Sequence, residues 1–160
     1  MRYLYAVPVL VAALVTALAV TGTAVGDVDR KKRLTTGLTG AEEVPGPGDP
    51  DGRGTAKIRL NTAKEGGGAR APQVCWNISV REIETATMAH IHKAPKGEAG
   101  PIVVDLSPQP GEAEDGEWSG CRRPVDKPLV RDIIRNPEQY YVNVHNAPFP
   151  SGAIRGQLGD

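Results

Sequence analysis

The sequence has few aromatic residues and no excess of charge of either sign. One Phe, two Trp and four Tyr occur among 160 residues, so a core must be built mainly from aliphatic side chains and alanine. The 19 basic and 19 acidic side chains give a formal net charge of zero. Because a nucleic-acid-binding protein needs a basic surplus to neutralise phosphates, the charge balance argues against a nucleic-acid partner. The length predicts a single domain.

Cysteine and histidine are also scarce, with two and three residues, whereas glycine and proline are abundant. The 19 Gly and 14 Pro favour many turns between short elements. The chain shows no internal repeat and no regular alternation of strands with long helices. These absences exclude a repeat architecture and an α/β fold.

The longest apolar run lies near the N-terminus. Residues Val9–Val20 follow Arg2, and small residues then continue to Gly26. This order is typical of a secretory signal peptide. We therefore expect residues 1–26 to be removed, 27–33 to form a flexible basic lead, and 34–160 to fold as a secreted, extracytoplasmic domain. The alternative is an uncleaved anchor, and only in that case do we expect contact with a membrane.

The two cysteines are Cys75 and Cys121. An exported chain reaches an oxidising compartment, which favours a disulfide between them. The chain-entropy argument gives a bridge closing a loop of this length a stabilisation of about 4 kcal/mol. The alternative is a pair of free thiols that bind a metal, but no CxxC spacing supports it.

Alternating apolar and polar residues predict about eight short strands. We expect them at 34–38, 55–60, 73–80, 87–92, 102–106, 116–120, 140–145 and 153–158. One short helix is expected at 129–135, where Pro128 suits the first turn and Asn136 with Pro137 ends it. The pattern predicts an all-β fold, an antiparallel β-sandwich of Greek-key, superoxide-dismutase-like type with one short helix.

All three histidines fall in two of the expected strands. His90 and His92 are two positions apart, so they share the non-core face of their strand with Met88. His145 and Asn143 lie on the non-core face of the strand at 140–145. Three neutral imidazoles on neighbouring strands would form a copper or zinc site, with copper favoured by its intrinsic affinity.

The alternative interpretation is that the histidines hold neighbouring turns. They would then hydrogen-bond to the turns at 95–100 and 147–152 and would bind no metal.

Other polar residues give weaker indications of a functional site. In particular, Glu42 and Glu43 are interpreted as solvated loop charges.

Three stretches of the sequence resemble the CHRD, or chordin-type, domain family. They are LTGAEEVPGPGDPDGRGTA at 38–56, AHIHKAPKGEAGPIVVDL at 89–106 and YYVNVHNAPFPSGAIRGQL at 140–158. CWNISV and the SGC at 119–121 resemble the secreted bacterial branch of that family. The resemblance covers about 34–160. It implies a secreted β-sandwich of undefined biochemistry, acting as a binding or structural domain rather than an enzyme, with an unknown extracellular or cell-envelope partner.

A second, fainter resemblance is to the copper site of Cu/Zn superoxide dismutase. His90, His92 and His145 are similar to three copper ligands of that family, and Arg155 is similar to its channel arginine. This implies an alternative function, a mononuclear copper enzyme that acts on superoxide. The chain departs from the pattern because it has no fourth histidine to bridge copper to zinc and no histidine-rich zinc loop.

Overall fold

The computed structural model describes residues 31–62 and 71–159, so the expected signal peptide at 1–26 lies outside the described residues. The described part holds eight strands, one α-helix and two short 3₁₀ helices, at Gly40–Glu42 and Pro137–Gln139. The main elements are β1 (Lys31–Thr39), β2 (Arg53–Asn61), β3 (Gln73–Arg81), β4 (Met88–Lys93), β5 (Ile102–Asp105), β6 (Glu117–Arg122), α1 (Lys127–Arg135), β7 (Tyr140–His145) and β8 (Ile154–Gln157).

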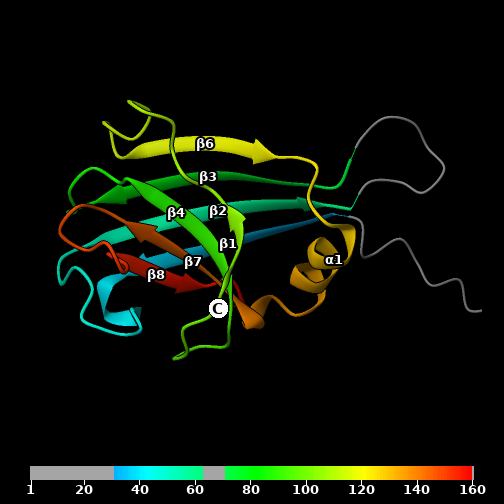
Figure 1. Ribbon diagram of the computed structural model, residues 1–160, viewed down its shortest axis with the longest axis horizontal. Helices are drawn as coiled ribbons and strands as arrows, with labels where there is room; N and C mark the ends of the chain where they lie inside the picture. Colours follow the sequence, from blue (N-terminus) through cyan, green and yellow to red (C-terminus); the bar gives the residue numbers. More distant parts are fainter. Residues whose placement is uncertain (1–30, 63–70, 160) are drawn as a thin grey trace, which may run out of the picture.

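The eight strands form one antiparallel sheet that curls into a nearly closed barrel, in the order β5-β4-β7-β8-β1-β2-β3-β6 (Figure 1). Strands β5 and β6 are therefore its two edges. Asp105 of β5 and Arg122 of β6 form an ion pair between these edges. Trp118 of β6 also donates from Nε1 to the carbonyl of Leu106 at 2.9 Å. The predicted all-β antiparallel fold with eight strands and one short helix is confirmed.

The apolar core lies between the two halves of the curled sheet. In Figure 1, β4 and β7 cross in front of β1 and β2, and buried apolar residues from all four strands belong to one cluster. Ala89 and Ile91 of β4 are fully buried, as the alternation predicted. Val142 and Val144 of β7 are equally buried. This leaves the intervening side chains of β4 and β7 on the outer face of the sheet.

The single helix begins and ends close to the expected positions. The side chain of Asp126 caps α1 by accepting a hydrogen bond from the backbone N–H of Leu129 at 3.3 Å, and Asn136 ends the helix. Val130 and Ile133 are fully buried against the core. No helix in the part of the chain that the structure describes is long and apolar enough to cross a membrane.

The expectation of a flexible lead at 27–33 is wrong for its last three residues. Residues 31–33 are the first residues of β1 and pair with 59–61 of β2 in antiparallel register. Lys32 also donates from Nζ to the carbonyl of Ile134 at 2.8 Å. Backbone pairing needs no apolar side chain, so a strand that begins with three charged residues shows no alternation at its start. Residues 27–30 lie outside the described residues.

The predicted disulfide between Cys75 and Cys121 is present. The two residues face each other directly in the pairing of β3 with β6. No free thiol remains in the chain. A disulfide in this position fits an extracytoplasmic protein, because the cytosol keeps thiols reduced.

Candidate metal centre

The antiparallel pairing of β4 with β7 brings the three histidines together. His145 of β7 faces Met88 of β4, one side-chain step from His90 on the same face. His92 faces Tyr141 at the other end of the pairing. Ring nitrogens of the three histidines, one from each, lie within 4.8 Å of one another. The predicted placement on the non-core face and the predicted neighbourhood are both observed.

The cluster faces away from the apolar core but is not at the protein surface. His90 is 8% exposed and His145 is 6% exposed. Two loops, at 94–101 and 146–153, contact the outer face of the sheet at this point through hydrogen bonds. The histidines therefore lie in a polar layer between the sheet and these loops.

Two of the histidines hold these loops through one ring nitrogen. Nδ1 of His92 lies 2.8 Å from the carbonyl oxygen of Gly100, and Nδ1 of His145 lies 3.1 Å from that of Pro150. Each Nδ1 must donate the proton, so in the neutral ring Nε2 keeps its lone pair. Hydrogen bonds of this kind orient metal-ligating histidines. The expected turn contacts are thus present, and they leave each Nε2 with the lone pair that a metal ion would need.

The remaining nitrogens converge. Nδ1 of His90 lies 3.2 Å from Nε2 of His145, and Nε2 of His92 is buried without a hydrogen-bond partner. Two nitrogens bound to one tetrahedral metal ion at 2.0–2.1 Å lie about 3.3–3.4 Å apart. The separation between His90 and His145 is therefore close to that of two ligands of the same ion.

All three rings are held in the neutral form that binds metals. Burial, reinforced by the neighbouring histidines, lowers the pKa of His90 to about 4. Burial also lowers the pKa of His92 and of His145, although the hydrogen bonds to Gly100 and Pro150 oppose this. At neutral pH the cluster carries no positive charge that would repel a cation.

A stack of side chains supports His92. The ring of Tyr141 is stacked on the imidazole, and the guanidinium of Arg155 lies 3.4 Å from the centre of the Tyr141 ring. Arg155 is 2% exposed and donates to the carbonyl oxygens of Glu98 at 2.7 Å and Pro95 at 3.3 Å. The arginine therefore fixes the loop whose Gly100 carbonyl orients His92.

A buried carboxyl lies beside the cluster, and sequence reasoning missed it. Asn143 faces His90 across the β4–β7 pairing and donates from Nδ2 to Oε2 of Glu43 at 3.2 Å. Glu43 is 6% exposed, and burial raises its pKa to about 7. The interpretation of Glu43 as a solvated loop charge is wrong. Its loop is rich in Gly and Pro and has no apolar periodicity that could have signalled burial.

Met88 and Asp105 flank the cluster differently. Met88 is 42% exposed and lies on the same face as the histidines. Asp105 faces His90 from β5, but its carboxylate accepts two hydrogen bonds from Ser107 and pairs with Arg122. The carboxylate of Asp105 is therefore already engaged, whereas the thioether sulfur of Met88 is available as a further ligand near the site.

The sequence model of the CHRD domain family matches residues 34–158. This range covers most of the chain and contains the three histidines, both cysteines, Asn143 and Arg155. Neither a curated protein nor a solved structure matches the chain.

Proposed function

This chain belongs to the CHRD domain family, and on that premise we propose that it is an extracytoplasmic metal-binding domain. In this proposal His90, His92 and His145 hold one copper ion. The observation that carries it is the convergence of three neutral imidazoles, among which Nε2 of His92 has no hydrogen-bond partner. A buried polar atom left unpaired costs on the order of 1–3 kcal/mol, and a metal ion would remove that cost.

The donor set favours copper over other metals. Three imidazoles suit copper and zinc, whereas magnesium and calcium require oxygen ligands. Divalent copper binds a given nitrogen site more tightly than zinc does. The thioether of Met88, on the same face, is a soft donor that would favour the cuprous state. With three protein nitrogens, one coordination position stays open for water or a small ligand.

Two features support a location outside the cytoplasm. The first is the Cys75–Cys121 disulfide, because disulfides form and persist in oxidising compartments and are rare in the cytosol. The sequence before the domain also has the order of a signal peptide. A copper-binding domain in that compartment would store or sequester the ion, or pass it to a partner.

The dismutase alternative lacks a specific structural support. A channel arginine would need a guanidinium free to attract an anion toward the metal. Here Arg155 is buried, and its guanidinium is engaged with two backbone carbonyls and with Tyr141. Its observed contacts are those of a residue that positions a loop, so we do not extend the proposal to superoxide chemistry.

Calorimetric titration of the untagged protein with Cu²⁺ and Zn²⁺ tests the proposal. We expect one copper per chain, with zinc weaker by at least about tenfold. His90→Ala, His92→Ala and His145→Ala should each weaken copper binding at least about 100-fold, because each removes one ligand. Asn77→Ala is the control, since it truncates an exposed polar side chain on β3, a strand that contributes no residue to the cluster.

Circular dichroism and thermal unfolding of each variant show whether it is folded before it is titrated. If the wild type binds copper no more tightly than a folded variant lacking all three histidines, the histidines only hold the neighbouring turns and the proposal is wrong. If zinc binds more tightly than copper, the site is a metal site but the assignment to copper is wrong.

A further inference from the structure

A group of seven basic residues lies on three neighbouring strands of this neutral chain. Strands β1, β2 and β3 are neighbours and contain no acidic residue. Their basic residues are Lys31, Lys32, Arg33, Arg53, Lys57, Arg59 and Arg81. The region of β1, β2 and β3 is therefore strongly positive, although the net charge of the whole chain is zero.

Four of these side chains share the outer face of β1 and β2. Lys31, Arg33, Lys57 and Arg59 are exposed, and they alternate with residues that face the core. We call these four residues the basic face. None of them forms an ion pair with another residue in the described ranges.

The arrangement is unfavourable in the absence of a ligand. Arg33 and Arg59 lie directly opposite each other in the pairing of β1 with β2. Like charges placed directly opposite on neighbouring strands destabilise a sheet. An anion bound between the two guanidinium groups would turn this repulsion into attraction.

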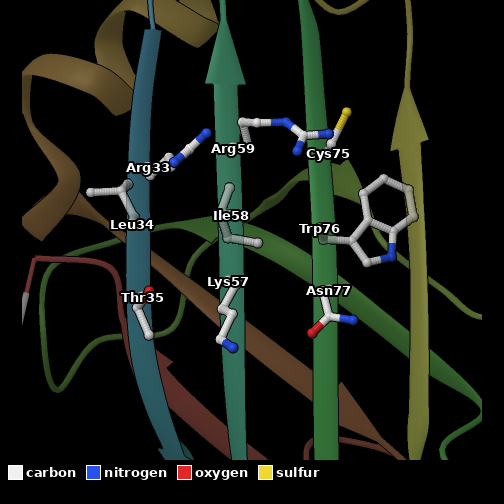
Figure 2. A pocket seen from close by; sticks show the side chains of 9 residues that line it. All are labelled: Arg33, Leu34, Thr35, Lys57, Ile58, Arg59, Cys75, Trp76 and Asn77. Carbon is white, nitrogen blue, oxygen red and sulfur yellow. The ribbon is translucent and has the colours of Figure 1, made fainter.

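The basic face is hollowed rather than flat. A hollow of about 280 Å³ lies over β1, β2 and β3. Figure 2 shows Arg33, Arg59 and Cys75 in one row across these strands, and Thr35, Lys57 and Asn77 in the row two positions away. A second hollow of about 470 Å³ is lined by basic residues that include Lys31, Lys32, Arg33 and Arg59. Arg33 and Arg59 line both hollows, so the two hollows are adjacent.

We propose that the basic face binds a linear, phosphate-bearing polyanion of the cell envelope. Side chains two apart on a strand recur about every 6.6–6.8 Å, so Lys31 with Arg33, and Lys57 with Arg59, form two rows of regularly spaced cations. Guanidinium groups bind phosphate through two parallel hydrogen bonds, and lysines add positive charge. The site is separate from the histidine cluster, which lies on β4 and β7.

The structure favours a polymer over a lipid bilayer. Amphipathic membrane-binding surfaces insert apolar side chains between the headgroups. Among the described residues, the exposed large apolar side chains are Met88 and Ile102, which lie on β4 and β5 and not on the basic face. The ring of Trp76 is half-buried and turned toward β6, where it packs against Gly120, away from the four cations of the basic face (Figure 2). It is therefore not placed among them as a platform on which bases could stack.

Binding of long-chain inorganic polyphosphate to the metal-free protein tests this proposal. We expect binding that weakens steeply as salt is raised, because counterions are released from the polymer. Lys57→Gln with Arg59→Gln should weaken binding at least about tenfold at low salt and reduce the salt dependence. The matched control is Arg123→Gln with Arg135→Gln, which removes the same charge from exposed positions outside both the basic face and the loops over the histidines.

Three outcomes would overturn the proposal. The first is no binding of polyphosphate at low salt. The second is an equal loss of affinity in the control variant, which would indicate a response to net charge alone. The third is binding to phosphatidylglycerol vesicles without binding to the polymer, which would indicate a membrane surface instead. Copper titration of both variants should be unchanged, which separates this result from that of the metal site.

Discussion

The ring of Tyr141 lies almost parallel to the ring of His92, with ring centres 4.8 Å apart and planes 11° apart. Arg155 packs on Tyr141, and the backbone N–H of Gly100 donates to the Tyr141 hydroxyl at 3.2 Å. The same Gly100 offers its carbonyl to His92. The orientation of one candidate ligand is therefore set by residues that would not themselves touch the metal.

Replacement of Arg155 should weaken both the fold and the site. Arg155→Lys loses the planar group that contacts Tyr141 and cannot reproduce the hydrogen bonds to Pro95 and Glu98. Hydrogen bonds from charged groups are worth about 1.5–3 kcal/mol each. We therefore expect the free energy of unfolding, measured with urea, to fall by about 2–4 kcal/mol. Copper affinity should fall roughly tenfold, because the change removes contacts that orient the ligand His92 without touching the metal.

The exposed Arg123 provides the control for this change. Arg123→Lys should leave unfolding within about 0.5 kcal/mol of wild type. Wild-type stability and copper affinity in Arg155→Lys would show that the stack does not position His92.

Removal of the disulfide should destabilise the domain without altering the site. The bridge ties β3 to the edge strand β6, and neither strand contributes a residue to the histidine cluster. Cys75→Ser with Cys121→Ser should lower the free energy of unfolding by about 2–5 kcal/mol, and a folded variant should still bind copper with wild-type affinity. Alkylation of unreduced wild type should label no thiol, and a labelled thiol would contradict the structure.

His90 should contribute a loss of stability to the metal-free protein as the pH falls from about 6.5 to about 4. The folded state holds the pKa of His90 at about 4, whereas an unfolded histidine titrates near 6.5. Between these values the unfolded chain binds more protons than the folded one, so unfolding becomes easier as pH falls. Urea unfolding across this range measures the slope. The slope should shrink in His90→Gln, and an unchanged slope would show that His90 is not its source.

Glu43 should act on stability in the opposite direction. Its pKa is about 7 in the folded state and near 4.5 in an unfolded chain, so folding favours the protonated carboxyl. As pH rises from about 4.5 through 7, the unfolded chain releases this proton first, and the folded state loses relative stability. Glu43→Gln should therefore be more stable than wild type at pH 8 by about 1–3 kcal/mol, with a smaller difference at pH 5.

Unfolding of both proteins at the two pH values checks this prediction. Glu42→Gln is the matched control, because the neighbouring Glu42 is paired with Lys96 near the surface. A similar gain in Glu42→Gln would mean that the effect comes from the general loss of negative charge rather than from the buried carboxyl.

The sequence by itself determined the strands of the core and the face on which each histidine lies. Ala89, Ile91, Val142 and Val144 are apolar at every second position, and all four are buried. A period of two is a local property of an extended chain, so it can be read without knowing which strands are neighbours. The pairing of Cys75 with Cys121 was equally accessible, because the chain has no other cysteine.

Only the tertiary structure decided which residues meet on the outer face of β4 and β7 and which of them are buried. It places β7 beside β4, which brings His145 to His90, and it lays two loops over them, which buries the cluster. It also buries Glu43 beside Asn143 and extends β1 to Lys31. These features depend on contacts between segments far apart in the chain, and a hydrogen bond to a distant carbonyl or a strand paired through its backbone leaves no periodic pattern in the sequence.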